Sequence, residues 1–178
     1  MDKFLNTGSS PNNRVASEVI NIRPALPGDA EGIANCLAVA FQPYRIDYTP
    51  GAFHDTILSV NGIIARMGKM TILVAENEMA RIVGTIAFAA VSLDEGHIRG
   101  MAVVPDFQGK GVARQLLAAA EMSLHTMGCS RATLDTTKLL ERAILFYTRN
   151  GYRATGTVKD FFGMPLFEYM KILSGEIG

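Results

Sequence analysis

A glycine-bearing turn is the segment of the chain whose residue types best suit chemistry. The run Gln108-Gly109-Lys110-Gly111-Val112-Ala113 follows the strand-like residues 98–105 and opens the amphipathic residues 112–127. Glycine lets the backbone approach a ligand closely, and the first amides of a helix have no carbonyl partner, so both features favour a phosphate group. The turn therefore predicts a phosphate-bearing cofactor.

The turn matches neither of two familiar nucleotide-binding patterns. GxGxxG is absent because Arg114 stands where the last glycine is needed, and GxxxxGK(S/T) is absent as well. A glycine turn between a strand and a helix can also be present for steric reasons alone. The elements around the turn therefore matter to its interpretation.

Hydrophobic periodicity and turn residues predict the element order βααβββαβαββ. Antiparallel strands followed by βαβ crossovers indicate an α/β fold, in which helices cover the faces of a mixed sheet. The expected strands are residues 19–23, 71–76, 81–91, 98–104, 131–136, 155–162 and 166–173, and the expected helices are residues 27–41, 52–67, 112–127 and 140–149.

The composition is that of one globular domain. The 178 residues are 48% hydrophobic, with 17 Lys and Arg against 17 Asp and Glu, which gives no overall field toward nucleic acid or an anionic membrane. The polar residues 1–17 predict a flexible tail without the apolar stretch of a signal peptide, and residues 18–178 a single domain. No apolar run reaches the ~18 residues of a membrane helix, so the expected location is the cytoplasm.

The two cysteines are expected to be packing residues. Cys36 and Cys129 lie in helix-like apolar runs and lack a CxxC spacing. Such isolated cysteines predict neither a zinc site nor a disulfide framework. No metal site is expected.

Two motifs in the chain resemble those of the GNAT family of N-acetyltransferases. The segment from Val103 to Ala113 reads V-x-P-x-x-Q-x-x-G-x-A, and the segment from Ala143 to Tyr152 reads A-I-x-x-Y-x-x-x-G-Y. The resemblance in element order extends over residues 20–173. It implies a GNAT-like fold, with a mostly antiparallel sheet of six to seven strands flanked by about four helices.

The resemblance also implies acetyl-coenzyme A as cosubstrate. In the family, the pantetheine arm pairs with a bulged strand, here Met101, Ala102 and Val103, and the pyrophosphate lies on the following turn. Lys110 and Arg114 add local positive charge, although a solvated surface would explain them too. The turn residues that would wrap the pyrophosphate are Gln108, Gly109, Lys110, Gly111, Val112, Ala113 and Arg114.

Direct attack of an amine on the thioester is the chemistry that the resemblance implies. Tyr147 takes the place of the family tyrosine that donates a proton to the departing sulfur, although it would also fit as a core aromatic residue beside Phe146. Asp135 takes a place where some relatives carry a base for the amine, and an ordinary solvated carboxylate is the alternative. His97 and Glu95 are further candidates for the base.

One position departs from the family pattern. Relatives often carry Asn seven residues before the tyrosine, where this chain has Leu140. Any hydrogen bond that this Asn makes to cofactor or substrate is therefore absent.

The acceptor is expected to be a small primary amine, bound by the loop that precedes the second helix. Tyr44, Arg45 and Asp47 are the expected contacts, with Arg45 suited to a carboxylate and Asp47 to an amine, and Tyr48 and His54 lie nearby. Loop polarity alone would also explain these residues. The chain shows no long acidic or aromatic tract that would indicate a peptide or nucleic-acid groove.

Two other functions and one mode of assembly stay open. The acceptor could be a protein N-terminus or a lysine, or the chain could be a coenzyme A-binding sensor without turnover, as the missing Asn would allow. The closing strands in residues 155–173 could present an edge for pairing in a homodimer.

Overall fold

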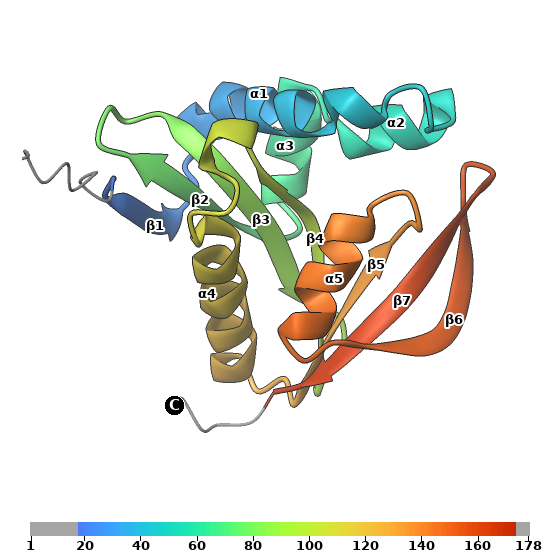
Figure 1. Ribbon diagram of the computed structural model, residues 1–178. Helices are drawn as coiled ribbons and strands as arrows, with labels where there is room; N and C mark the ends of the chain where they lie inside the picture. The colour runs from blue at the N-terminus through green and yellow to red at the C-terminus, as the bar shows by residue number, and fades with distance from the viewer. Residues whose placement is uncertain (1–17, 174–178) are drawn as a thin grey trace, which may run out of the picture.

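Seven strands form one twisted sheet in the computed structural model, which describes residues 18–173. The expected tail, residues 1–17, lies outside the described residues. The strand order is β1-β2-β3-β4-β5-β7-β6, and every neighbouring pair is antiparallel except β4 with β5 (Figure 1). The strands are β1 Ile20–Pro24, β2 Thr71–Asn77, β3 Ile82–Ala90, β4 Glu95–Val103, β5 Arg131–Thr136, β6 Arg153–Phe161 and β7 Met164–Ile172.

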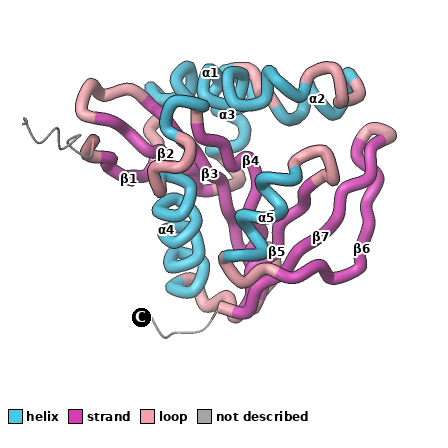
Figure 2. Tube along the Cα trace, in the orientation of Figure 1, coloured by secondary structure: helices cyan, strands magenta, loops and turns pink. Residues whose placement is uncertain are grey.

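Helices lie on both sides of this sheet. In Figures 1 and 2, α4 and α5 lie in front of the sheet and α3 lies behind it, next to α1. No helix within residues 18–173 has both the length and the apolar character needed to cross a bilayer. The helices are α1 Ala30–Phe41, α2 Pro50–Thr56, α3 Val60–Met67, α4 Val112–Thr126 and α5 Glu141–Arg149.

The expected α/β fold and its mostly antiparallel sheet are confirmed, and the helix expected at residues 52–67 is two helices instead of one. Ile57 leaves the helical conformation, with ψ at 72°. Two residues later, the hydroxyl of Ser59 accepts a hydrogen bond from the Gly62 amide at 3.2 Å and caps α3. A polar capping residue inside an apolar periodic run therefore ends one helix and begins the next.

Strand β4 also begins three residues before its expected start. The amide of Val91 donates to the Glu95 carbonyl at 2.8 Å, which extends the hairpin with β3, and Gly96 pairs with Ala132 on β5. Pairing on both edges holds residues with little intrinsic preference for strand in an extended conformation.

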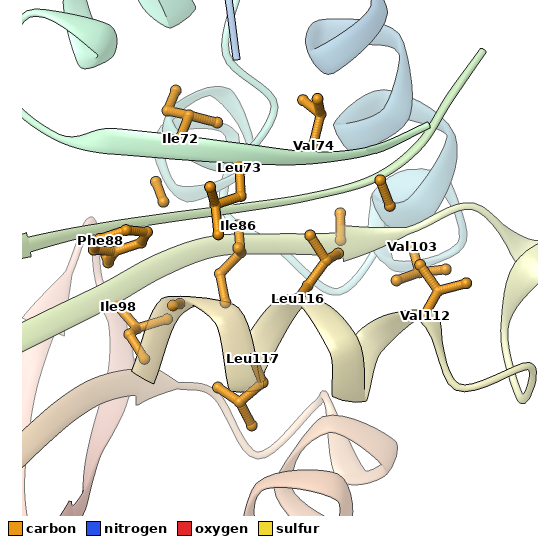
Figure 3. Packing of buried hydrophobic residues seen from close by; sticks show 14 of the residues in the cluster. Ile72, Leu73, Val74, Ile86, Phe88, Ile98, Val103, Val112, Leu116 and Leu117 are labelled. Atoms are coloured by element: carbon orange, nitrogen blue, oxygen red, sulfur yellow. The ribbon is translucent and has the colours of Figure 1, made fainter. Parts of the chain in front are cut away.

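Helix α4 packs on the sheet through an apolar face. Figure 3 shows Leu116 and Leu117 of α4 against Ile86 and Ile98 of the strands, and these four side chains are buried. Strand glycines permit this approach: a Cβ on Gly84 would lie 2.9 Å from Leu116 Cδ1, and one on Gly96 would overlap Leu124. The close contact fixes the height of the α4 N-terminus above the sheet.

Cys36 and Cys129 are both buried and unpaired with each other, as expected for packing residues. Burial raises the pKa of the Cys36 thiol to about 12. That thiol is therefore protonated at neutral pH.

An irregularity in β4 opens the sheet beside β5. The pairing with β3 changes register between Thr85 and Ala87, and the extra residue is accommodated at Gly100, whose φ is +61°. The parallel pairing with β5 ends at Ile98 and Leu134. The later residues of β4 therefore diverge from β5, and their backbone groups on that side have no strand partner within residues 18–173.

Candidate active site

A cavity of about 750 Å³ lies where β4 and β5 diverge. Gly96 and Ile98 face α4, so strand alternation places His97 and Arg99 on the opposite face. The lining comes from both sides of the sheet. It includes Tyr44, Asp55, Arg66, His97, Arg99, Met101, Ala102, Val103, Gln108, Gly109, Gly111, Ala113, Asp135, Leu140, Tyr147, Lys159, Phe161 and Phe162.

On the α4 side, the glycine turn presents free backbone amides. Gly109 and Gly111 have φ values of +76° and +82°, and a Cβ on either would meet no atom within 4 Å. Glycine is thus required here by backbone conformation and not by crowding. The first intrahelical hydrogen bond runs from the Gln115 amide to the Gly111 carbonyl at 3.1 Å, so the amides before Gln115 remain for an anion.

The side chains of this turn divide into three groups. Gln108 Nε2 donates to the Val103 carbonyl at 2.9 Å, which ties the turn to β4. Lys110 is exposed and its Nζ lies 4.8 Å from the Phe107 ring centroid, and Arg114 is exposed too. Val112 is buried in the core. The cavity lining does not include Lys110, Val112 or Arg114. These residues could contact a bound ligand only through their backbone amides, or where the ligand extends beyond the cavity.

Tyr147 brings a phenol to the same cavity from α5. Its ring packs between Phe146 and Tyr152, with centroid distances of 5.4 and 5.8 Å. Its hydroxyl lies 3.4 Å from Met101 Sδ. Burial raises the pKa of Tyr147 above its ordinary value, so the phenol is protonated and able to donate at neutral pH.

A hydrogen-bonded group of polar side chains lies on the opposite side of the sheet. Asp135 accepts hydrogen bonds from Lys159 Nζ at 3.0 and 3.1 Å, and its Oδ2 lies 3.8 Å from His97 Nε2. Lys159 Nζ also forms an ion pair with Glu168 at 2.9 Å. Asp135 is thus an ion-paired carboxylate beside an imidazole.

The contacts of His97 are compatible with a tautomer that carries the proton on Nδ1. Its Nδ1 lies 3.0 Å from Thr133 Oγ1, and that hydroxyl lies 3.2 Å from Glu95 Oε1 and 3.3 Å from the Gly96 carbonyl. The carboxylate and the carbonyl only accept, so a Thr133 hydroxyl that donates its single proton to either of them accepts from His97 Nδ1–H. This tautomer leaves Nε2 with a free lone pair.

Burial lowers the pKa of His97, although the carboxylate of Asp135 opposes the effect. The imidazole is therefore neutral at neutral pH. A neutral imidazole on a cavity wall can accept a proton.

Aromatic rings and a hairpin enclose this side of the cavity. Phe41 lies 6.4 Å from Tyr44 and 6.5 Å from Tyr48 between ring centroids. The β6–β7 hairpin reaches α2, where Thr49 Oγ1 donates to the Phe162 carbonyl at 2.8 Å. Figure 1 shows the hairpin tip extending toward α2.

The acceptor contacts expected from the sequence are only partly gathered at the cavity. Tyr44 lines it, whereas Arg45 and Asp47 are exposed and do not. Arg45 lies 5.8 Å above the Phe53 ring centroid instead. Leu140 lines the cavity at the position where relatives carry Asn.

Sequence reasoning did not propose roles for Arg66, Arg99 and Lys159. Arg99 follows His97 at the spacing that puts both side chains on one face of a strand, so alternation could have found it. Arg66 and Lys159 come from distant elements, and no local pattern in the sequence brings them to this wall.

Known proteins share this fold and part of this sequence. Residues 68–154 match the family described as acetyltransferase (GNAT) domain. This part of the chain is a GNAT acetyltransferase domain. The family expected from the two motifs is therefore confirmed.

Solved GNAT structures have the same architecture. The PaiA N-acetyltransferase of Thermoplasma acidophilum, in complex with coenzyme A, is 18% identical with a TM-score of 0.74, over 86% of this chain and 99% of that one. A GNAT acetyltransferase of Staphylococcus aureus Mu50 is 19% identical with a TM-score of 0.72, over 88% and 100% of the two chains. At these identities the likeness shows the fold.

One relative has a named activity. The mycothiol acetyltransferase of Propionibacterium freudenreichii subsp. shermanii is 33% identical over 90 residues, which is 48% of this chain and 28% of that protein. At the level of the GNAT domain, the expected class, an acetyl-coenzyme A-dependent N-acetyltransferase, and its cosubstrate are confirmed.

Proposed function

We propose that this protein transfers an acetyl group from acetyl-coenzyme A to the primary amine of a small molecule, by direct attack of the amine on the thioester. The observation that carries the proposal is the cavity at the β4–β5 divergence. It joins the amides of the α4 turn, the phenol of Tyr147 and the pair His97 and Asp135.

The donor fits the α4 side. Free amides at residues 109–114 suit a pyrophosphate, because helix-start amides bind phosphate oxygens without particular side chains. Met101, Ala102 and Val103 lie beyond the last β4–β5 pair, so strand backbone is available for the amide groups of the pantetheine arm. The Val103 carbonyl is partly engaged by Gln108.

The reaction then needs one bond formed, one bond broken and two proton transfers. The amine nitrogen bonds to the thioester carbonyl carbon, and the carbon–sulfur bond breaks. His97 Nε2 takes the proton from the amine, and Asp135 stabilises the imidazolium. Tyr147 donates its proton to the departing thiolate. Holding both substrates in one cavity contributes as much as these transfers, on the order of 7 to 11 kcal/mol in favourable systems.

A small acceptor is favoured over a peptide. The hydrogen bond between Thr49 and Phe162 joins the hairpin tip to α2, and aromatic rings line the wall between them. An extended peptide would need an open groove at this place. The relative named mycothiol acetyltransferase supports acetyl transfer as the reaction.

The test is release of free thiol from acetyl-coenzyme A by the purified protein over a panel of small amines and peptides. Release with small amines, together with mass-spectrometric detection of the N-acetyl product, is the expected result. Release with peptides alone would favour a protein acetyltransferase. Calorimetric binding of acetyl-coenzyme A without release across the panel would favour a sensor.

A further inference from the structure

A half-buried guanidinium lies on the acceptor side of the cavity, without a partner among the described residues. Arg66 is in the last turn of α3 and lines the cavity. Within residues 18–173 its side chain has no ion pair or hydrogen bond, whereas Arg23 and Arg131 each have two acidic partners. Arg66 is therefore a half-buried cation that no carboxylate within residues 18–173 pairs with.

The backbone is shaped to admit this side chain. A Cβ on Gly100 would lie 2.6 Å from Arg66 Nη1, and Gly100 sits at the irregularity of β4 with φ at +61°. The glycine thus lets the guanidinium lie directly over the strand. The position of the guanidinium therefore depends on the same β4 irregularity that opens the sheet.

A second guanidinium lies in the same part of the cavity. Arg99 Nη2 forms an ion pair with Asp55 Oδ2 at 2.9 Å, and both residues line the cavity. Two guanidinium groups thus face one carboxylate. These three side chains together carry a net charge of +1.

The electrostatics of Arg66 agree with the geometry. Burial and then the charge of Arg99 lower the pKa of Arg66 to about 10, and Asp55 offsets this only in part. The charged form is therefore poorly compensated in the protein alone. An anion beside Arg66 would compensate it and form charge-assisted hydrogen bonds.

The donor does not supply that anion. The pyrophosphate is expected at the α4 turn, and Arg99 lies on the strand face that points away from α4. Arg99 lies instead two residues from His97, on the same face. A group bound by the two arginines belongs to the molecule whose amine meets His97.

We infer that Arg66, assisted by Arg99, binds an oxyanion group of the acceptor, so that the substrate is a small primary amine that also carries a carboxylate or a phosphate. The inference rests on the proposed function and adds the substrate class. It replaces Arg45, the carboxylate contact expected from the sequence, with a residue that lines the cavity.

Matched acceptors test this inference. Each ω-amino carboxylic acid is compared with its primary amide, and each amino alcohol with its phosphate monoester, in the thiol-release assay. The native protein should prefer the charged member by about 10- to 100-fold in kcat/KM, the range of a charge-assisted hydrogen bond. Whichever pair shows the larger ratio identifies carboxylate or phosphate as the recognised group.

Variants assign the preference to Arg66. Arg66→Met should remove most of it by raising KM for the charged acceptor, with kcat and the neutral acceptor nearly unchanged, and Arg66→Lys should keep part of it. Arg149→Met, on the exposed surface of α5 outside the cavity, is the control and should match the native protein. Circular dichroism checks that each variant is folded.

The inference and the proposed function fail in different ways. Equal kcat/KM for charged and neutral acceptors, or a preference lost in Arg45→Met and kept in Arg66→Met, overturns the inference and leaves the transferase standing. If no amine releases thiol, calorimetry of the same acceptors with the coenzyme A-bound protein decides. Binding of the charged member that Arg66→Met abolishes supports the oxyanion site, and its absence overturns it.

Discussion

The hydroxyl of Tyr147 is the polar end of a side chain that is otherwise surrounded by Phe146, Tyr152 and Met101. Its raised pKa keeps it protonated, and its one hydrogen-bond partner within residues 18–173 is a thioether. Because this hydrogen bond is weak, the hydroxyl is free to donate to a leaving group instead.

We expect Tyr147→Phe to lower kcat by about 100-fold and to leave KM for acetyl-coenzyme A within about twofold, because only the transferable proton is removed. Steady-state kinetics with a true acceptor measures both constants. Tyr152→Phe is the matched control, since that phenol is buried in the core and does not line the cavity. Unchanged kcat in Tyr147→Phe would exclude proton donation by this residue.

The pKa of His97 predicts how kcat changes as pH decreases below neutrality. Its pKa lies below the ordinary value of 6.5, and only the neutral ring accepts a proton, so kcat should fall as pH decreases with a midpoint below 6.5. Asp135 raises the pKa of His97 and Lys159 lowers it. Asp135→Asn should therefore move the midpoint down, and Lys159→Met should move it up. Midpoints that stay in place in both variants would assign the base elsewhere.

A site residue could be predicted from the sequence when its role depends on nearby residues in the chain. Gly109 and Gly111 follow from a turn that needs positive φ, and Tyr147 from a spacing along one helix. Arg66 reaches the cavity only because Gly100 admits it across the sheet. Such a contact depends on the fold as a whole and has no periodic signature.

At the scale of elements, we expect the strand–turn–helix unit of β4 and α4 to bind the acetyl donor. Gly84 and Gly96 bring α4 close to the sheet, and Gln108 ties the turn to the Val103 carbonyl. The amides at the helix start are therefore held in place before any ligand arrives. A preorganised site of this kind loses little conformational entropy on binding.

We expect Gly111→Ala to weaken acetyl-coenzyme A binding about tenfold and to destabilise the protein by about 1 to 2 kcal/mol, because alanine resists the φ of +82° at this N-cap. Calorimetry and thermal unfolding measure the two effects. Gly28→Ala is the matched control, since a Cβ there also meets nothing within 4 Å and its φ lies outside the positive range. Equal affinities in the two variants would contradict the role of the turn.

The order and type of the strands were predictable at this scale, and the break between α2 and α3 was not. Alternation and turn residues mark the strands, whereas Ser59 interrupts an apolar run that has helical spacing on both sides. The start of β4 was missed for the opposite reason. Two neighbouring strands impose extended structure on Glu95, Gly96 and His97, whose own preference for it is weak.

At the scale of the whole molecule, an arginine on β1 links the segment before α1 to the neighbouring strand β2. Arg23 on β1 forms ion pairs of 2.7 Å with Asp29, before α1, and with Glu76 on β2. The Arg23 guanidinium holds the pKa of Asp29 below its ordinary value. A carboxyl with a lowered folded-state pKa stabilises the protein above its unfolded pKa, and this contribution is lost as pH falls through the folded value.

We expect Asp29→Asn to lower the unfolding free energy at pH 7 by about 1 kcal/mol, a modest value because solvent screens part of the interaction. The corresponding decrease in Tm is about 2 to 4 °C. The difference should shrink as pH falls below about 4, where the unfolded carboxyl is already protonated. Thermal unfolding at several pH values measures this, and a gap that is constant with pH would rule out the ion pair as its cause.

The divergence of β4 and β5 leaves an opening that connects the two faces of the sheet. We expect donor recognition in β4 and α4, in front of the sheet, and acceptor recognition in α3, the segment before α2 and the β6–β7 hairpin, behind the sheet and at its edge. The two sets of residues meet only at the edges of β4 and β5 on either side of this opening. Acceptor preference can therefore be redesigned, by replacing the rear elements alone, in a protein that keeps its acetyl donor.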